Sequence, residues 1–257
     1  MASLSVKRSI SPNDIASEIE SRLVVGMSSC QLTRVQIWLE HLLTPLAKCY
    51  GNCEFIKDSN EFLSKLEEVK SIAAENNWDW NEKVLFSVDV KALYPSVKFN
   101  YLIVALEHCF KKCTTWSQEV SDSLIRLILY TLKNQKILWS DQYYTLNHGI
   151  PTRAKHSVPL ANIFLSFIFI NSLDSNRSCT LMFDNNIELW CRFIDEGSGV
   201  YNGNVHDFLK WFILLNKCFS KYDLDLTGDT YSHIISNHSV IAEKEEKVFN
   251  FLDIDIF

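Results

Sequence analysis

Apolar side chains recur at helical spacing along much of the chain. Residues three and four apart share one face of an α-helix, so apolar residues at that spacing predict a helix with a buried side. The segment 158–173 is apolar almost all round, which predicts a fully buried helix. The predicted helices cover 11–23, 32–46, 60–74, 101–112, 117–133, 158–173 and 207–222.

Shorter runs of apolar and β-branched residues between these helices predict strands. The clearest are Lys83–Val90, with the sequence KVLFSVDV, and Ile187–Asp195. The remaining predictions are a hairpin over 136–146, a return strand over 199–201, and strands over 231–241 and 247–256. This order predicts an α+β fold with a mainly antiparallel sheet and helices packed on one face.

Composition narrows the class of protein. Of 257 residues, 47% are hydrophobic and 22% charged, which excludes a disordered, collagen-like or coiled-coil chain. None of the eight cysteines has CxxC spacing, so free thiols in a reducing compartment are favoured over disulfides or a zinc site. The start of the chain has no apolar signal core, and the apolar stretches 124–132 and 160–170 are interrupted or too short to span a bilayer. We expect a soluble intracellular protein in the nucleus, the cytoplasm or an organelle, with no membrane partner.

The charge is unevenly distributed. The net charge of −6 argues at first against a nucleic-acid partner. Residues 83–155, however, carry 10 basic and 5 acidic side chains, whereas 1–82 has a net charge of −4 and 156–257 of −7. The basic middle third is either chance or a positive surface for a polyanion.

Both clear strands finish at or next to an acid, Asp89 in the first and Asp195 in the second. If the strands are neighbours, the two carboxylates meet at one edge of the sheet and repel each other unless a cation lies between them. One or two carboxylates plus phosphate oxygens satisfy Mg²⁺, and two such ions form a phosphoryl-transfer site. Either aspartate alone is more often a plain strand-end or turn residue.

Four segments resemble the motifs of reverse transcriptases, in the same order. FSVDVKALYPSV at 86–97 resembles the first catalytic motif, and RFIDEGSGVYNG at 192–203 resembles the third. GIPT at 149–152 with SVPLANIFL at 157–165 resembles the second, and FNFLDIDI at 249–256 resembles a later palm strand.

The form of the motifs is similar to that of Penelope-like retroelements. The sequence D-V-x-x-L-Y at 89–94 and the FLD at 251–253 carry this likeness, with softer support from 41–46 and 56–63. The resemblance implies a right-hand polymerase, with a helical, fingers-like region over 1–82 and a palm with fingers insertions over 83–257. It also implies RNA-templated DNA polymerisation with Mg²⁺ or Mn²⁺, acting on RNA or an RNA/DNA duplex and a dNTP.

The resemblance assigns roles to individual residues. Asp89 and Asp195 match the metal-binding aspartates, and the Val90 carbonyl matches the main-chain ligand beside them. Tyr94 matches the aromatic residue under the sugar of the incoming nucleotide, and Thr152 lies in the part of the second motif that borders this nucleotide. Further expectations are phosphate contacts for Lys91 and Lys155, although either is more simply a solvated lysine, and a bracing role for Ser157 and Asn162.

Three departures weaken the assignment. Glu196 replaces the second aspartate of the third motif, as a further catalytic and metal-binding carboxylate, and Arg153 stands in the nucleotide-binding segment where the family usually has glycine. The chain also stops at Phe257, where we expect a thumb to follow. An alternative is therefore an inactive scaffold or subunit of a larger, RNA-containing complex. A third interpretation, an unrelated α+β module with chance motif matches, predicts that Asp89 and Asp195 lie too far apart to share a metal.

Overall fold

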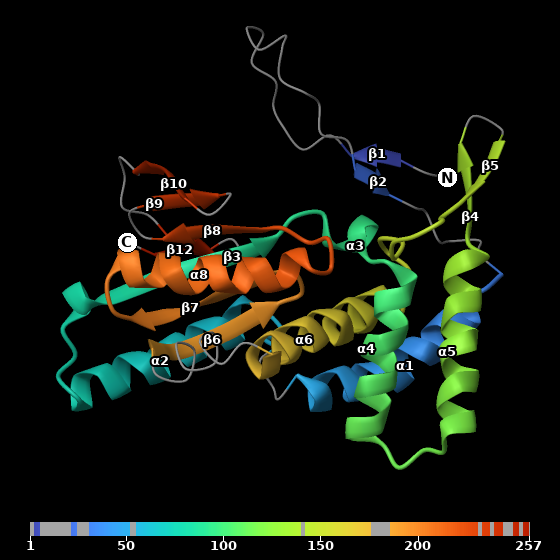
Figure 1. The fold of residues 1–257 in the computed structure, drawn as a ribbon, viewed down its shortest axis with the longest axis horizontal. Coiled ribbons are helices and arrows are strands. Elements are labelled where there is room, and N and C mark those ends of the chain that lie inside the picture. The colour runs from blue at the N-terminus through green and yellow to red at the C-terminus, as the bar shows by residue number, and fades with distance from the viewer. Residues whose placement is uncertain are drawn as a thin grey trace, which may run out of the picture.

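A six-stranded sheet in which every pairing is antiparallel forms one half of the molecule (Figure 1). The computed structural model describes residues 3–5, 22–24, 31–51, 55–139, 142–175, 186–230, 233–236, 239–243, 249–251 and 254–256. The strands in order across the sheet are β10 (Ser239–Glu243), β9 (His233–Ser236), β8 (Leu226–Thr230), β3 (Lys83–Val90), β7 (Glu196–Asn202) and β6 (Ile187–Phe193).

The central strand β3 has the bounds that its sequence predicts, and its alternating side chains separate the two faces of the sheet. Phe86 and Val88 are buried beneath the helices, and the ring of Phe86 lies 4.7 Å from that of Phe208 on α8 (Val205–Ser220). Asp89 has the opposite parity, and its side chain is exposed. One face of β3 therefore packs against the core, and the other face carries the exposed side chain of Asp89.

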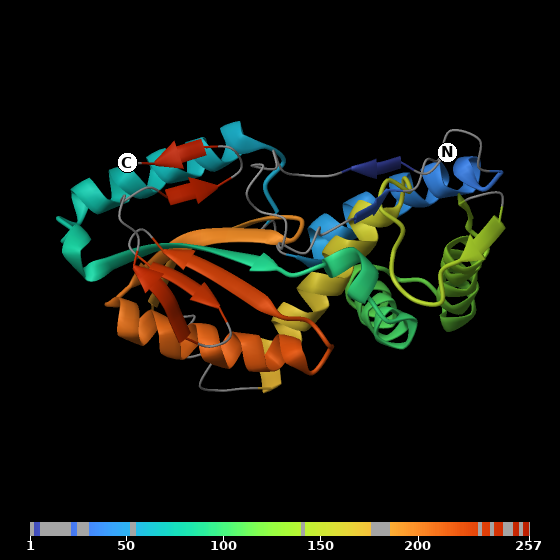
Figure 2. The ribbon, with the colours of Figure 1, turned by 90° about the horizontal axis from the view of Figure 1, so that it is seen from above.

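Helices cover the two faces unequally (Figure 2). α8 and part of α6 (Ser157–Ser175) form the main layer on one face, as predicted. On the other face, α2 (Ser59–Glu75) packs against β6, where Phe62 and Cys191 form a small second core. The hairpin of β11 (Phe249–Phe251) and β12 (Ile254–Ile256) also lies on this side, beside β3.

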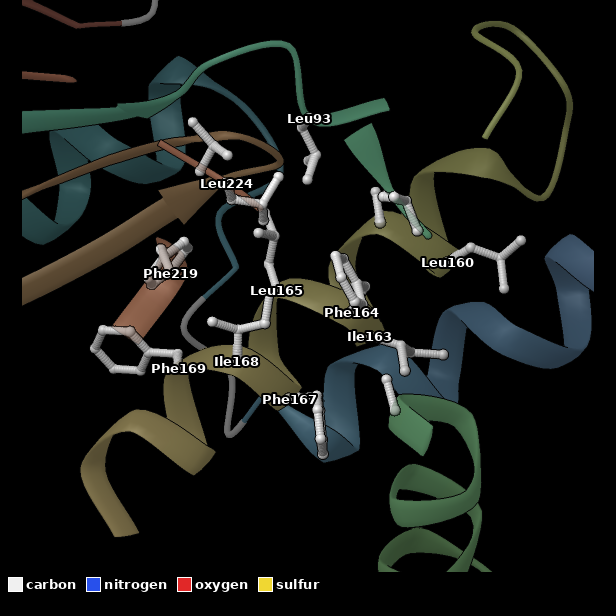
Figure 3. Close-up of a cluster of buried hydrophobic side chains, with 14 of the residues drawn as sticks. Leu93, Leu160, Ile163, Phe164, Leu165, Phe167, Ile168, Phe169, Phe219 and Leu224 are labelled. Atoms are coloured by element: carbon white, nitrogen blue, oxygen red, sulfur yellow. The ribbon is translucent and has the colours of Figure 1, made fainter. Parts of the chain in front are cut away.

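The other half of the molecule is helical, and α6 joins the two halves. α6 contacts α1 (Thr33–Tyr50) and α4 (Phe99–Cys113), and α4 in turn contacts α5 (Gln118–Lys133). Figure 3 shows apolar side chains of α6 packed among residues of neighbouring elements such as Leu93 and Phe219. α6 is thus the buried helix that its sequence predicts. The remaining elements are β1 (Ser3–Ser5), β2 (Arg22–Val24), η1 (Trp80–Glu82), α3 (Leu93–Ser96), β4 (Lys136–Trp139) and β5 (Gln142–Thr145).

Several strand predictions need correction. The segments expected to form single strands over 231–241 and 247–256 contain two antiparallel pairs, β9–β10 and β11–β12. Asn237 and His238 stand between the first two strands, and asparagine favours turns over strand interiors. The sequence analysis did not predict β8. The expected helix 11–23 lies outside the described residues, except that Arg22 and Leu23 belong to β2.

Among the described residues, no helix is both long and apolar enough to cross a membrane.

A buried histidine at the start of α6 gives the fold a testable pH dependence. His156 is completely buried, and its Nε2 lies 2.9 Å from Oγ1 of Thr131. Burial lowers the pKa of His156 to about 4, whereas an unfolded chain has a value of roughly 6.5. The folded state therefore favours the neutral ring. This contribution to stability is complete above pH 6.5 or so and is lost as the pH falls towards 4.

We predict that acidification from about pH 7 to 4 removes on the order of 3 kcal/mol from the free energy of unfolding through His156 alone. Urea denaturation across this range, with His156→Gln as the comparison, isolates the effect, because other groups titrate in both proteins. His148→Gln, at an exposed position, is the matched control. Equal acid sensitivity of the wild type and His156→Gln would contradict the prediction.

Candidate active site

The pairing of β3 with β7 gathers the predicted acids at one edge of the sheet. Asp89 is paired with Glu196 on β7 and with Thr227 on β8. The backbone N–H of Val90 donates to the carbonyl oxygen of Asp195 over 3.1 Å. The condition set for this meeting, that the two acid-ended strands are direct neighbours, is not met, because β7 lies between β3 and β6. The acids still meet, because the turn after β6 carries Asp195 back to the end of β3.

The three carboxylates differ in direction and exposure. Asp89 and Glu196 form a cross-strand pair, so their side chains stand on the same face of the sheet, away from α8. Asp89 is exposed, whereas Glu196 and Asp195 are half-buried. Asp195 lies in the two-residue turn that joins β6 to β7. The edge thus presents a cross-strand pair of acids with a third carboxylate at the turn beside them.

That turn is strained at Ile194. Its φ of +54° lies in the left-handed region, which a β-branched side chain rarely adopts. Such a conformation costs roughly 1–3 kcal/mol and persists only where surrounding contacts hold it.

Arg192 supplies those contacts. Its side chain is only 6% exposed, and Nη1 donates to the carbonyl oxygen of Ile194 over 2.6 Å. The same nitrogen donates to Oδ1 of Asn162 over 3.3 Å, and Nη2 donates to Oγ of Ser166 over 3.1 Å. The guanidinium also lies 4.2 Å from the centre of the Phe55 ring. The buried guanidinium of Arg192 therefore links the acidic turn to α6 by hydrogen bonds.

Tyr94 lies on α3, just beyond the end of β3. Its side chain is half-buried, and its pKa is raised to about 12, first by burial and then by the charge of Asp195. The phenol therefore stays protonated at neutral pH, within the field of the acidic turn.

Backbone hydrogen bonds fix the second motif to α3. Ile150 N–H donates to the carbonyl oxygen of Tyr94 over 2.7 Å, and Gly149 N–H donates to that of Val97 over 2.8 Å. Gly149 has φ +85°, and a Cβ there would lie 3.0 Å from the Tyr94 carbonyl oxygen, so glycine is required. Thr152, two residues after Ile150, is half-buried beside this junction.

Arg153 occupies a backbone conformation suited to glycine. Its φ is +71°, and its side chain is exposed. Lys155 and Lys91, the two predicted phosphate-binding cations, are exposed as well. The expected bracing residues make structural contacts: Ser157 Oγ donates to the Pro151 carbonyl oxygen over 2.6 Å, and Asn162 accepts the bond from Arg192.

The carboxylate and carbonyl oxygens at this edge could hold a hard divalent cation with few protein ligands. The described residues contain no group of three or more His, Cys, Asp or Glu side chains placed to hold a metal ion. Carboxylate and carbonyl oxygens at the edge are nevertheless the ligand type that Mg²⁺ takes, and this ion needs only one or two of them when a substrate phosphate supplies the rest. The residues present therefore suit metal bound together with a nucleotide rather than a preassembled metal cage.

The sequence analysis gave no role to Arg192. The available signal was a charged residue inside the apolar run LWCRF, because an arginine in a buried strand requires several acceptors.

The fold is similar to that of known polymerases. No family model and no curated protein sequence matches the chain. Among solved structures, it is similar to apo telomerase from Candida tropicalis (12% identity, TM-score 0.63, covering 98% of this chain and 49% of that one). It is also similar to telomerase from Candida albicans in complex with a fragment of telomeric RNA (12%, 0.59, 88% and 36%). The RNA-dependent RNA polymerase of BmCPV at its elongation state is a third neighbour (10%, 0.54, 87% and 21%).

Identities this low concern the fold alone, and the chain spans less than half the length of each of these structures. The chain has an α+β fold like that of the fingers and palm of these polymerases. This likeness favours the motif resemblance over chance motif matches in an unrelated module.

Replacing Arg192 with lysine keeps the charge but removes the planar fork that reaches Ile194, Asn162 and Ser166 together. We predict a loss of about 2–3 kcal/mol in the free energy of unfolding, measured with urea, because buried acceptors lose a charged donor. Arg126→Lys on the exposed face of α5 is the matched control and should change stability by less than roughly 0.5 kcal/mol. Equal, small effects of the two substitutions would show that Arg192 does not hold the turn.

The left-handed backbone at Arg153 predicts opposite outcomes for two neighbouring glycine substitutions. Arg153→Gly relieves a conformation that costs a side-chain-bearing residue roughly 1–2 kcal/mol, which offsets the entropy that glycine adds to the unfolded chain. We expect between no change and a gain of about 1 kcal/mol in stability. Lys155→Gly has no strain to relieve and should lose about 0.5–1 kcal/mol. Thermal unfolding of both variants tests this, and an equal loss in the two would contradict it.

Proposed function

We propose that the chain is a nucleotidyltransferase of the reverse transcriptase type, which extends a DNA primer on an RNA template. The observation that carries the proposal is the return of the β6–β7 turn to β3, which sets Asp195 and Glu196 beside Asp89. The order of the motifs around this edge supports it. Within reverse transcriptases, the form of the motifs favours the Penelope-like group.

In this proposal each residue of the edge has a definite task. Asp89 and Asp195, with the Val90 carbonyl and the longer Glu196 in support, are the residues that would hold the divalent cations. Mg²⁺ or Mn²⁺, when bound, lowers the pKa of the primer hydroxyl and stabilises charge on the phosphates. Tyr94 lies under the sugar, where its ring disfavours a 2′-hydroxyl.

The bond changes are those of an in-line displacement. The primer 3′-oxygen forms a bond to the α-phosphorus and gives up its proton to solvent, while the bond from that phosphorus to the bridging oxygen breaks and pyrophosphate leaves. Most of the rate enhancement would come from positioning and from charge stabilisation at this edge. RNA is the proposed template, and the telomerase structure in complex with an RNA fragment supports an RNA partner in general.

A second candidate function is that of an inactive polymerase fold, which serves as a scaffold or as a subunit of a larger complex that contains RNA. Two observations favour it. The third motif carries the longer Glu196 where the family has an aspartate. The glycine-like position beside the proposed nucleotide site carries the long cation Arg153.

Primer extension separates the two candidates. The purified chain, a DNA primer on an RNA template, dNTPs and Mg²⁺ or Mn²⁺ should give extension products, and Asp89→Asn should lower the rate by at least about 100-fold. The matched control is Asp229→Asn, because Asp229 lies on β8 two positions from Thr227 and has the same parity as Asp89. Extension that survives Asp89→Asn would contradict the assignment of the metal site. No extension by the wild type or by Arg153→Gly would contradict the enzyme and favour the scaffold.

A further inference from the structure

Three cysteines come together where the last turns of α1 and α4 pack against each other in the helical half (Figure 1). The Oη of Tyr50, the last residue of α1, lies 2.7 Å from Nδ1 of His108 on α4. The Nζ of Lys112, one turn further along α4, lies 5.5 Å from the centre of the same tyrosine ring. The end of α1 is therefore held against the end of α4, which brings Cys49 close to Cys113.

The thiols of the two helices are in direct contact. Cys113 is hydrogen-bonded both to Cys49 across the two helices and to Cys109 one turn earlier on α4. Burial, and after it the bond to Cys49, raises the pKa of Cys113 to about 11, and burial raises the pKa of Cys109 as well. All three are free thiols; Cys49 is exposed, whereas Cys113 is half-buried and Cys109 is buried. An oxidant in solution therefore reaches Cys49 first, with Cys113 as the thiol in contact with it.

One pair within this cluster suits a disulfide better than the others. Cys109 and Cys113 are four residues apart on one helix, where Cβ atoms lie about 5–6 Å from each other, whereas a disulfide needs roughly 3.5–4.5 Å. Cys109 is hydrogen-bonded to Cys113, and Cys49 acts on it only through charge. Cys49 and Cys113 lie in the last turns of different helices. Helix ends fray, so the backbone there can adjust to the geometry of the bond.

The placement of the thiols favours oxidation over metal binding. Among the described residues, no group of three or more His, Cys, Asp or Glu side chains is placed to hold a metal ion. An accessible thiol beside a second, less accessible one is the arrangement in which the first thiol reacts with an oxidant and the second resolves the product. The two thiols that fit these roles are Cys49 and Cys113.

We propose that Cys49 and Cys113 are a redox-sensitive pair, which a peroxide converts into a disulfide that fastens the end of α1 to the end of α4. The sulfur of Cys49 attacks one oxygen of the peroxide and gives up its proton, the O–O bond breaks, and a sulfenic acid and one water form. The sulfur of Cys113 then attacks the sulfur of Cys49. The S–O bond breaks, and the hydroxyl leaves with the proton of Cys113 as a second water. Two electrons thus pass from the two thiols to one hydrogen peroxide, and the pair is independent of the proposed polymerase function.

The bridge would have a measurable effect on stability. It closes the long loop from 49 to 113, and a cross-link over a long loop removes much of the freedom of the unfolded chain. Both helices contact α6, so the bridge ties together elements that already pack around one core. We expect the oxidised protein to melt at least about 5 °C above the reduced protein, and we expect a thiol reductant to reverse this shift.

Peptide mapping by mass spectrometry under non-reducing conditions tests the pairing directly. After treatment of the full chain with hydrogen peroxide, the peptide with Cys49 should be joined to the peptide with Cys113, with the loss of two hydrogen atoms. Cys49→Ser and Cys113→Ser should each lose both the bridge and the rise in melting temperature. Because Cys49 is exposed, its serine variant is expected to fold like the wild type in the reduced state.

The controls address competing thiols. Cys218→Ala removes a buried thiol on α8, away from the cluster, and should keep the bridge. A triple variant with serine at Cys30, Cys53 and Cys179, which lie outside the described residues, should keep it as well. The proposal is overturned if peroxide leaves Cys49 only as a sulfenic or higher acid, or if Cys49 pairs with another cysteine or with a second copy of the chain. A bridged protein that melts no higher than the reduced one would overturn the proposed fastening of α1 to α4.

Discussion

The geometry of the acidic edge depends on one buried guanidinium. Arg192 joins the carbonyl oxygen of Ile194, in a turn that the backbone alone disfavours, to Asn162 and Ser166 on α6. α6 is the helix that connects the two halves of the molecule. The position of the turn is therefore fixed by contacts with the main hydrophobic core and not only by the β6–β7 hairpin. Without such an anchor, an isoleucine at positive φ would relax, and Asp195 would lose its place beside Val90.

The electrostatics of the edge follow from this placement. The fold holds a cross-strand Asp89–Glu196 pair and a nearby Asp195, an arrangement of like charges that is unfavourable unless a cation is available. Residues 123–155 carry five basic and one acidic side chain, a net charge of +4, whereas the whole chain has a net charge of −6. In the proposed function a metal ion would compensate the acids and basic residues would contact a polyanion, so the acidic net charge of the chain does not by itself argue against that function.

The sequence predicted those features that depend on local pattern. The bounds of β3 follow from its run of apolar and β-branched residues, and the buried nature of α6 follows from its uniform apolarity. The meeting of Asp89 and Asp195 at one edge of the sheet could be anticipated, because each acid lies at or next to a strand end. The position of β7 between β3 and β6 could not be predicted, because hydrophobic pattern does not specify strand order.

The short strands β9 to β12 were merged in the prediction for a related reason. Strands of three to five residues contain too few alternating positions for one strand to be distinguished from the next. The role of Arg192 and the left-handed backbone at Arg153 depend on contacts and torsions that no pattern of residue types records.

Binding of Mn²⁺ in the presence of a dNTP, followed by electron paramagnetic resonance, tests the account most directly, because it reports on the acidic edge without requiring turnover. The account predicts that the wild type binds Mn²⁺ and that Asp89→Asn and Asp195→Asn each abolish this binding. It also predicts that Asp229→Asn, at a position of the same parity on β8, leaves binding intact. Retention of bound Mn²⁺ by both single variants, or an equal loss in Asp229→Asn, would contradict the assignment of the edge as a metal-dependent polymerase site.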